Sequence, residues 1–184
     1  MRKALGRVGV GLLVVAVALI GLPAPAYASG EDEFWVQRYS GKCMDVRGDS
    51  DSVGTYVQQY DCNFTRAQQW KHTLVPGSSN VYTFTAGDGL CLEDRSSFMF
   101  NGAPVDQAQC NPYAPQMQWR FVGPYGPDSN GLWNWQIQNV QNPRCLDSEF
   151  STDNWKILLL KDCGMPTPGG GGWWNQQWTF YFRF

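Results

Sequence analysis

Three acidic residues occupy the same place in a repeated pattern, each two positions after a cysteine. They are Asp45, Glu93 and Asp147. An ionised carboxylate is a hydrogen-bond acceptor that can take two donors at once, either from a ligand or from the backbone amides of a turn. The three acids are therefore the first candidates for chemistry in this chain.

Each acid belongs to a longer repeat that uses all six cysteines of the chain. A second cysteine follows the first after 18 or 19 positions, and a Gln-rich or Met-Gln stretch ending in tryptophan closes each copy. The cysteine pairs are Cys43 and Cys62, Cys91 and Cys110, and Cys145 and Cys163. The closing tryptophans are Trp70, Trp119 and Trp178. A repeat in fixed order predicts three similar supersecondary units that complete one another, with one disulfide closing each unit.

The first 28 residues are predicted to be a secretory signal peptide. They begin with basic residues and no acidic ones, continue with an apolar run over 8–22, and end in Ala-Tyr-Ala at 26–28. These are the features of a cleaved leader, and an uncleaved membrane anchor is the alternative. We expect cleavage after Ala28 to release residues 29–184 as one secreted, extracellular domain with no membrane span.

Charge and cysteine content exclude several classes of partner. The net charge of the whole chain is −2, and removal of a basic leader makes the remainder more acidic. Such a surface, without basic clusters, argues against nucleic acid and anionic membranes as partners. An even number of cysteines in an exported chain favours disulfides over metal ligands or reactive thiols. The pattern predicts no metal site and no cofactor.

Short apolar stretches separated by turn residues predict an all-β fold. Apolar residues alternate or cluster at 34–36, 81–84 and 133–137, and Gly, Asp, Asn and Ser gather at 48–50 and 127–131. Many short strands at such intervals are typical of a barrel or sandwich. The third repeat also carries an insert over 166–172, beside Trp173 and Trp174, which we expect to be a flexible loop with a potential functional role.

The combination of Cys-Leu-Asp, Gly-Thr-x-Val, aromatic-Asp-Cys and Gln-x-Trp resembles the ricin-B-type lectin family from about Trp35 to Phe184. The resemblance implies a β-trefoil of three four-stranded lobes with pseudo-threefold symmetry, at about 33–76, 77–124 and 125–184. It implies a secreted carbohydrate-binding protein and places the three closing tryptophans in the core. It also implies that a sugar is held by the acid, by an aromatic residue two before the second cysteine, and by an Asn-Gln pair.

The first copy supplies most of these groups. It has Asp45, Tyr60 and Gln68, with Ala67 where the family has asparagine. The alternative interpretation is that Asp45 only fixes a turn through backbone amides and that Tyr60 is a half-buried strand residue.

The third copy supplies a different subset. It has Asp147, Asn175 and Gln176, but Lys161 replaces the aromatic residue, so that Trp155, Trp173 or Trp174 would have to provide a ring from another direction. As in the first copy, the acid could instead serve only a turn.

The second copy has lost nearly every group, with Glu93, Ala108 and Met117 at the three positions. We therefore expect sugar binding in the first and third lobes and a structural role for the second.

Catalysis is not expected. The single histidine, His72, follows a core tryptophan and is interpreted as a packing or surface residue, which leaves no base for a nucleophile triad. No phosphate loop, zinc spacing or calcium loop is present. A second hypothesis is a protein-interaction module, of the toxin-binding-subunit or inhibitor type, on a degenerate lectin scaffold. The incomplete sites and the many aromatic residues favour that alternative.

Overall fold

The computed structural model describes residues 32–96, 99–127, 131–164 and 173–182. The expected signal peptide at 1–28 and the insert at 166–172 lie outside the described residues. Among the described parts of the chain, no helix is both long and apolar enough to cross a membrane.

The described residues form β-strands and short 3-10 helices in three successive lobes. The first lobe contains β1 (Glu33–Gln37), β2 (Cys43–Val46), η1 (Arg47–Asp49), β3 (Val57–Tyr60), η2 (Arg66–Gln68) and β4 (Trp70–Leu74). The second contains β5 (Tyr82–Ala86), β6 (Cys91–Asp94), β7 (Ala103–Ala108), η3 (Pro115–Met117) and β8 (Trp119–Tyr125). The third contains β9 (Asn134–Asn139), β10 (Cys145–Asp147), β11 (Lys156–Ile157), β12 (Leu159–Lys161), η4 (Trp174–Gln176) and β13 (Trp178–Phe182).

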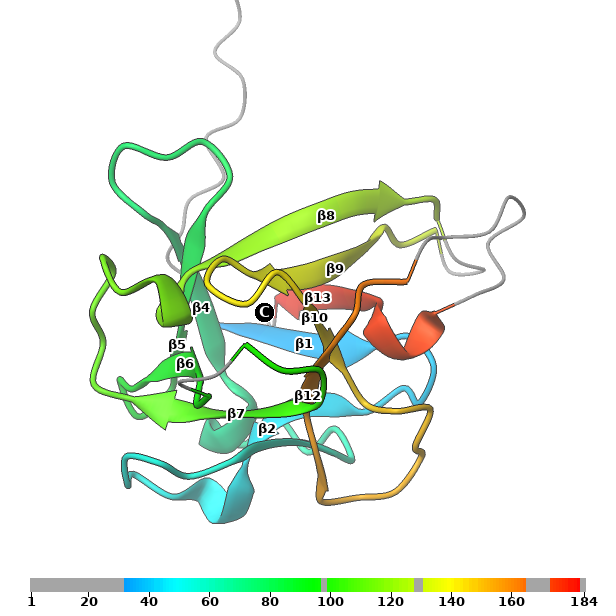
Figure 1. Cartoon of the computed structure of the whole chain (residues 1–184). Coiled ribbons are helices and arrows are strands. Elements are labelled where there is room, and N and C mark those ends of the chain that lie inside the picture. The colour runs from blue at the N-terminus through cyan, green and yellow to red at the C-terminus, as the bar shows by residue number, and fades with distance from the viewer. Residues whose placement is uncertain (1–31, 97–98, 128–130, 165–172, 183–184) are drawn as a thin grey trace, which may run out of the picture.

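The first and last strands of each lobe close into a barrel. Antiparallel pairs run in a ring from β1 to β13, β9, β8, β5, β4 and back to β1. The inner strands of each lobe form the hairpins β2–β3, β6–β7 and β10–β12. In Figure 1 the hairpin strands β2, β7 and β12 lie below β1, β8 and β9 of the barrel.

The hairpins also pair with one another. Strand β11 pairs with β3, β12 pairs with β7, and Tyr56 forms an isolated bridge with Asp106. The third strand of the last lobe is divided at Leu158, so that its two halves serve two different neighbours. A closed barrel of six strands with three interlocked hairpins is the β-trefoil arrangement, and the predicted fold class is confirmed.

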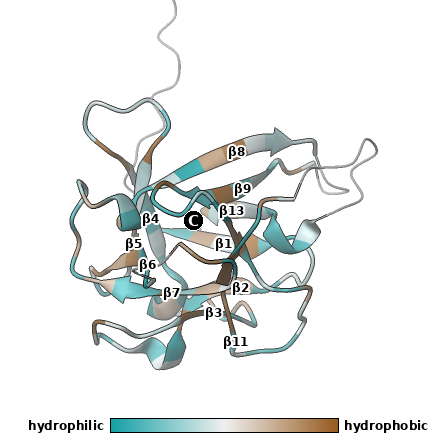
Figure 2. Cartoon of the chain, in the orientation of Figure 1, coloured by the Kyte–Doolittle hydropathy of each residue, from teal (hydrophilic) through white to brown (hydrophobic). Residues whose placement is uncertain are grey.

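The three closing tryptophans are buried in the barrel as expected. Their indole nitrogens donate to the carbonyl of the residue after the first cysteine of each lobe: Trp70 to Met44 at 3.0 Å, Trp119 to Leu92 at 3.1 Å, Trp178 to Leu146 at 3.2 Å. Each large side chain is thus buried without an unsatisfied N–H. Figure 2 shows apolar residues gathered where the strands meet and mostly hydrophilic residues in the outer loops.

One disulfide closes each lobe. The bonds join Cys43 to Cys62, Cys91 to Cys110, and Cys145 to Cys163, which confirms the predicted pairing. Each links residues 18 or 19 positions apart, and a crosslink of this span contributes about 3 kcal/mol, chiefly by restricting the unfolded chain. The bridges also fix the start of each hairpin to the segment that follows it.

Candidate functional site

The first-lobe site lies on the outward face of the β2–β3 hairpin. Side chains alternate along a strand, so Met44 faces the core while Asp45 faces away from it. Across the hairpin, Asp45 is paired with Gln58, and Tyr60 lies two residues farther on the same face. The hairpin thus brings the predicted Asp45 and Tyr60 together. Gln58 was not predicted to belong to the site, although it lies two residues before Tyr60 and therefore on the same face of the strand.

Asp45 is a buried carboxylate held by two amides. Its Oδ1 accepts a hydrogen bond from Gln58 Nε2 at 2.8 Å, and its Oδ2 accepts one from Gln68 Nε2 at 3.1 Å. Only 4% of the residue is exposed. Burial raises the pKa of Asp45 above its usual value, and the two amide hydrogen bonds partly oppose this rise. A carboxylate has about four acceptor positions, so two further donors can be accommodated.

Gln68 ties this carboxylate to the chain that follows the second cysteine. Its Nε2 also donates to the Asp61 carbonyl at 2.9 Å, and its Oε1 accepts from the backbone amides of Asn63 and Phe64 at 2.9 and 3.0 Å. The side chain is 0% exposed, and all its hydrogen-bonding groups are used within the protein. The structure therefore gives Gln68 the position of a brace that orients Asp45.

The rim of the first-lobe site is aromatic. Tyr60 is half-buried, and its ring centroid lies 5.6 Å from that of Trp155. Trp155 was considered a ring for the third-lobe site, and that assignment is wrong, since its ring lies against Tyr60 in the first lobe. The physical reason is the pairing of β11 with β3, which carries this part of the third lobe onto the first.

The third lobe repeats the buried carboxylate with different partners. Asp147 Oδ1 accepts from Asn175 Nδ2 at 2.8 Å and from the backbone amide of Glu149, and Oδ2 accepts from Gln176 Nε2 at 2.7 Å. Burial raises the pKa of Asp147, while these hydrogen bonds lower it. Leu159 is paired with Asp147 across the hairpin, at the position where the first lobe has Gln58. The structure thus brings together Asp147, Asn175 and Gln176, as the sequence predicted.

Gln176 occupies the same kind of brace position as Gln68. Its Oε1 accepts from the backbone amide of Gly164 at 2.9 Å and from Gln136 Nε2 at 3.0 Å. Its Nε2 donates to the Asp162 carbonyl at 3.0 Å. In both lobes, therefore, a fully buried glutamine joins the acid to the residues on either side of the second cysteine.

An aromatic residue lies against Gly164 of the third lobe, whose backbone amide is bonded to Gln176. Lys161, at the position where the family has a ring, forms a 2.6 Å ion pair with Glu149. The indole of Trp173 lies directly over Gly164, where a Cβ atom would overlap it. Its ring centroid lies 6.4 Å from that of Phe150. Both rings are exposed and belong to segments that also carry the site's polar groups.

The exposed rings of the third lobe continue onto the first. Phe150 packs edge-on against Tyr39 at 5.3 Å, and Trp174 lies under the guanidinium of Arg38 at 5.0 Å. We call Tyr39, Phe150, Trp173 and Trp174 the aromatic surface.

The second lobe has replaced the site by a pair of acids. Glu93 faces Asp106 across the hairpin, and Ala108 stands at the aromatic position. Met117 takes the place of the brace, with its Sδ accepting from the amide of Asn111 at 3.3 Å. Met117 cannot donate to the acid as Gln68 does, and the Glu93 carboxylate is instead hydrogen-bonded to the side chain of Gln116, which partly opposes the rise in the pKa of Glu93 caused by burial.

His72 is a packing residue at the barrel. Its Nδ1 lies 2.6 Å from Glu33 Oε2, which also accepts from Trp35 Nε1 at 3.0 Å. Its ring is surrounded by aromatic rings, including those of Tyr82 and Phe121. Within the described residues, no group of three or more His, Cys, Asp or Glu side chains is placed to hold a metal ion.

Comparison with known families gives one match over half of the chain. The model of the ricin-type beta-trefoil lectin domain matches residues 35–127. No curated protein matches the sequence.

Solved structures share the fold over most of the chain. The designed threefold-symmetric protein ThreeFoil has a TM-score of 0.67 and 27% identity, and the match covers 81% of this chain and 96% of that one. The Macrolepiota procera ricin B-like lectin in complex with lactose has a TM-score of 0.64 and 14% identity, covering 85% and 98%. The exo-β-1,3-galactanase of Clostridium thermocellum has a TM-score of 0.69 and 19% identity, covering 83% of this chain and 30% of the enzyme.

Proposed function

Because the chain belongs to the ricin-type β-trefoil lectin domain family, we propose that it is an exported, non-catalytic protein that binds neutral sugars through its first and third lobes. The observation that carries the proposal is the recurrence of one arrangement. In both lobes a buried carboxylate on the outward face of a hairpin is oriented by a buried glutamine. An isolated turn aspartate would not need this brace.

In the first lobe, Asp45 accepts hydrogen bonds from two neighbouring sugar hydroxyls, and Tyr60 lies under the C–H face of the sugar. The amides of Gln58 and Gln68 fix the carboxylate before the ligand arrives, so little ordering remains to oppose binding. A shallow site of this kind supports a dissociation constant of about a millimolar, near −4 kcal/mol.

In the third lobe, Asp147 plays the same part and Trp173 supplies the ring. Asn175 and Gln176 hold the carboxylate from one side, and Gly164 leaves room for the indole. Two working sites on one chain raise the affinity for a polysaccharide, since the second contact forms at a high effective concentration.

Export follows from the predicted leader and agrees with the three disulfides, which are stable in oxidising compartments. Catalysis is not part of the proposal. The one histidine, His72, is hydrogen-bonded to Glu33 and packs against aromatic rings such as that of Tyr82.

A glycan array probed with the oxidised mature protein tests the function. We expect binding to a restricted set of neutral glycans, with lactose as a first probe because the Macrolepiota lectin binds it. The double variant Asp45→Asn/Asp147→Asn should lose that binding, whereas the matched control Glu93→Gln in the second lobe should retain it. Thermal melts of all three proteins exclude unfolding as the cause. Unchanged binding by the double variant would refute the assigned sites.

The aromatic surface favours a second candidate, a protein partner that docks on exposed rings. Pull-down from culture supernatant separates the two functions. Recovery of one protein whose capture no sugar reduces, together with a blank glycan array, would favour the protein partner.

A further inference from the structure

A loop of the third lobe is fastened to the first-lobe hairpin. The side chain of Gln59 is fully buried, and its Nε2 donates to the carbonyls of Ser151 and Asp153, both at 2.9 Å. The backbone amide of Trp155 donates to the Gln59 carbonyl at 3.1 Å. A single strand residue of the first lobe thus holds both ends of the segment 151–155.

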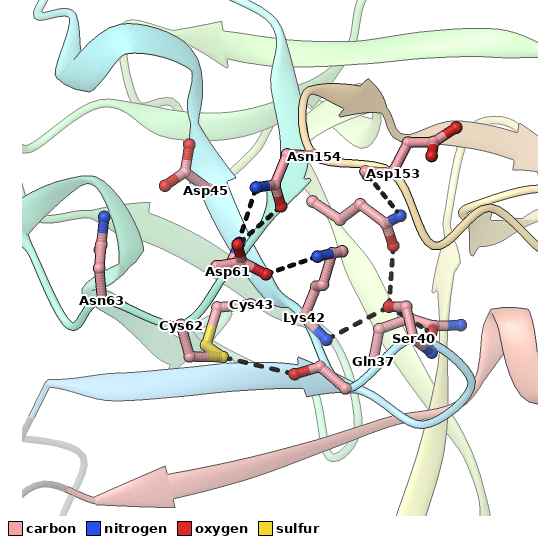
Figure 3. Close-up of polar contacts among 12 residues, drawn as sticks. Gln37, Ser40, Lys42, Cys43, Asp45, Asp61, Cys62, Asn63, Asp153 and Asn154 are labelled. Atoms are coloured by element: carbon pink, nitrogen blue, oxygen red, sulfur yellow. Dashed lines mark hydrogen bonds and ion pairs between the residues drawn. A yellow bond between two sulfur atoms is a disulfide. The ribbon is translucent and has the colours of Figure 1, made fainter.

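A second clamp fixes the same loop beside the sugar site. The amide of Asp61 donates to Asn154 Oδ1 at 3.0 Å, and Asn154 Nδ2 donates back to Asp61 Oδ2 at 2.8 Å. Lys42 Nζ lies 2.5 Å from the other carboxylate oxygen, and its hydrogen bond lowers the pKa of Asp61. Figure 3 shows Asn154 and Lys42 converging on Asp61, close to Asp45.

The clamped loop presents a large ring to solvent. Trp155 is 61% exposed and has a φ of 61°, a left-handed conformation that is unfavourable for a bulky residue. An exposed indole contributes little to the core, and the loop nevertheless holds it in a fixed position next to the first-lobe site. The ring stands 5.6 Å from Tyr60, tilted by 50°.

We propose that the first-lobe site binds two consecutive residues of a neutral glycan chain, and that Trp155 contacts the second. The first sugar lies on Asp45 and Tyr60, and the next lies against the indole supplied by the third lobe. This inference rests on the proposed function, and it makes the first site a composite of two lobes that selects oligosaccharides over single sugars.

The test is the dependence of affinity on chain length. Titration calorimetry would use β-1,3-galacto-, cello-, manno- and xylo-oligosaccharides from monomer to tetramer, with an Asp147→Asn background to silence the third lobe. We expect the affinity in the recognised series to rise roughly three- to tenfold from monomer to dimer, the range for an added aromatic contact. Trp155→Ala should abolish that rise, and Asn154→Ala should reduce it by loosening the loop.

Trp133→Ala is the matched control, because this tryptophan is 53% exposed and lies outside the site. It should leave the ratio of dimer to monomer affinity unchanged. A wild-type ratio in Trp155→Ala would overturn the inference while leaving the proposed function intact. An equal loss for monomer and dimer would also overturn it, since the indole would then act only by supporting Tyr60. Absence of binding to every sugar would defeat the proposed function and the inference with it.

Discussion

Asp106→Asn should stabilise the protein at neutral pH. Asp106 is 3% exposed, faces Glu93 across the β6–β7 hairpin, and has one carboxylate oxygen without a hydrogen-bond partner. Burial, and then the charge of Glu93, raise the pKa of Asp106 to about 6 from an ordinary value of 3.8. Arg95, 3.3 Å away, only partly compensates.

The magnitude follows from linkage between protonation and folding. The pKa of Asp106 is raised by about 2, which corresponds to about 3 kcal/mol of free energy of unfolding, since each pKa unit is worth about 1.4 kcal/mol. Because the folded pKa is higher than the unfolded one, the folded state holds the proton more tightly, and stability falls as the pH rises from about 4 to about 6. Asparagine resembles the protonated acid, so the variant escapes this loss. Its advantage should be complete above about pH 7 and nearly absent below about pH 4.

Urea denaturation at pH 7.5 and pH 3.5 measures this advantage directly. We expect Asp106→Asn to raise the free energy of unfolding by about 3 kcal/mol at the higher pH and by nothing at the lower one. Asp153→Asn, at an exposed acid, is the control and should change neither value. The reasoning is refuted if the variant is no more stable than wild type at pH 7.5, or if the gain is the same at both pH values.

Three further predictions concern the brace, the third-lobe ring and the disulfides. Gln68→Ala should lower the free energy of unfolding by about 3 kcal/mol, because two backbone amides and Asp45 lose their partner; a urea curve that coincides with wild type would contradict this. Gly164→Ala should weaken sugar binding in an Asp45→Asn background, since a methyl group must displace Trp173. If that variant bound sugar as tightly as the Asp45→Asn protein, Trp173 would not be part of the site. Reduction of the three disulfides should cost about 3 kcal/mol for each bridge, and equal melting temperatures with and without reductant would exclude this contribution.

The fold and the pairing of the cysteines were predictable because the sequence contains three copies of the same pattern of cysteines and tryptophans. Each cysteine pair and each closing tryptophan recurs at a matching position, and the tryptophans are buried with their indole N–H groups satisfied by the same carbonyl in every lobe. The grouping of Asp45 with Tyr60, and of Asp147 with Asn175 and Gln176, followed from the resemblance and is present in the structure.

The features that depend on contacts between lobes could not be predicted in this way. Trp155 joins the first-lobe site only because β11 pairs with β3, and no local pattern in the third lobe reveals that partner. The bracing position of Gln68 was equally hidden, since it depends on backbone amides whose direction is set by the turn after Cys62. Sequence identifies residue types at a site, whereas tertiary pairing decides which of them touch a ligand and which hold another side chain.

The number of sugar sites on one chain tests the central claim most directly. Calorimetric titration of residues 29–184, with the disulfides oxidised, against a recognised sugar should give two sites. Asp45→Asn and Asp147→Asn should each leave one site, and the double variant should leave none. A single site that survives both substitutions, or a third site abolished by Glu93→Gln, would contradict the assignment of binding to the first and third lobes.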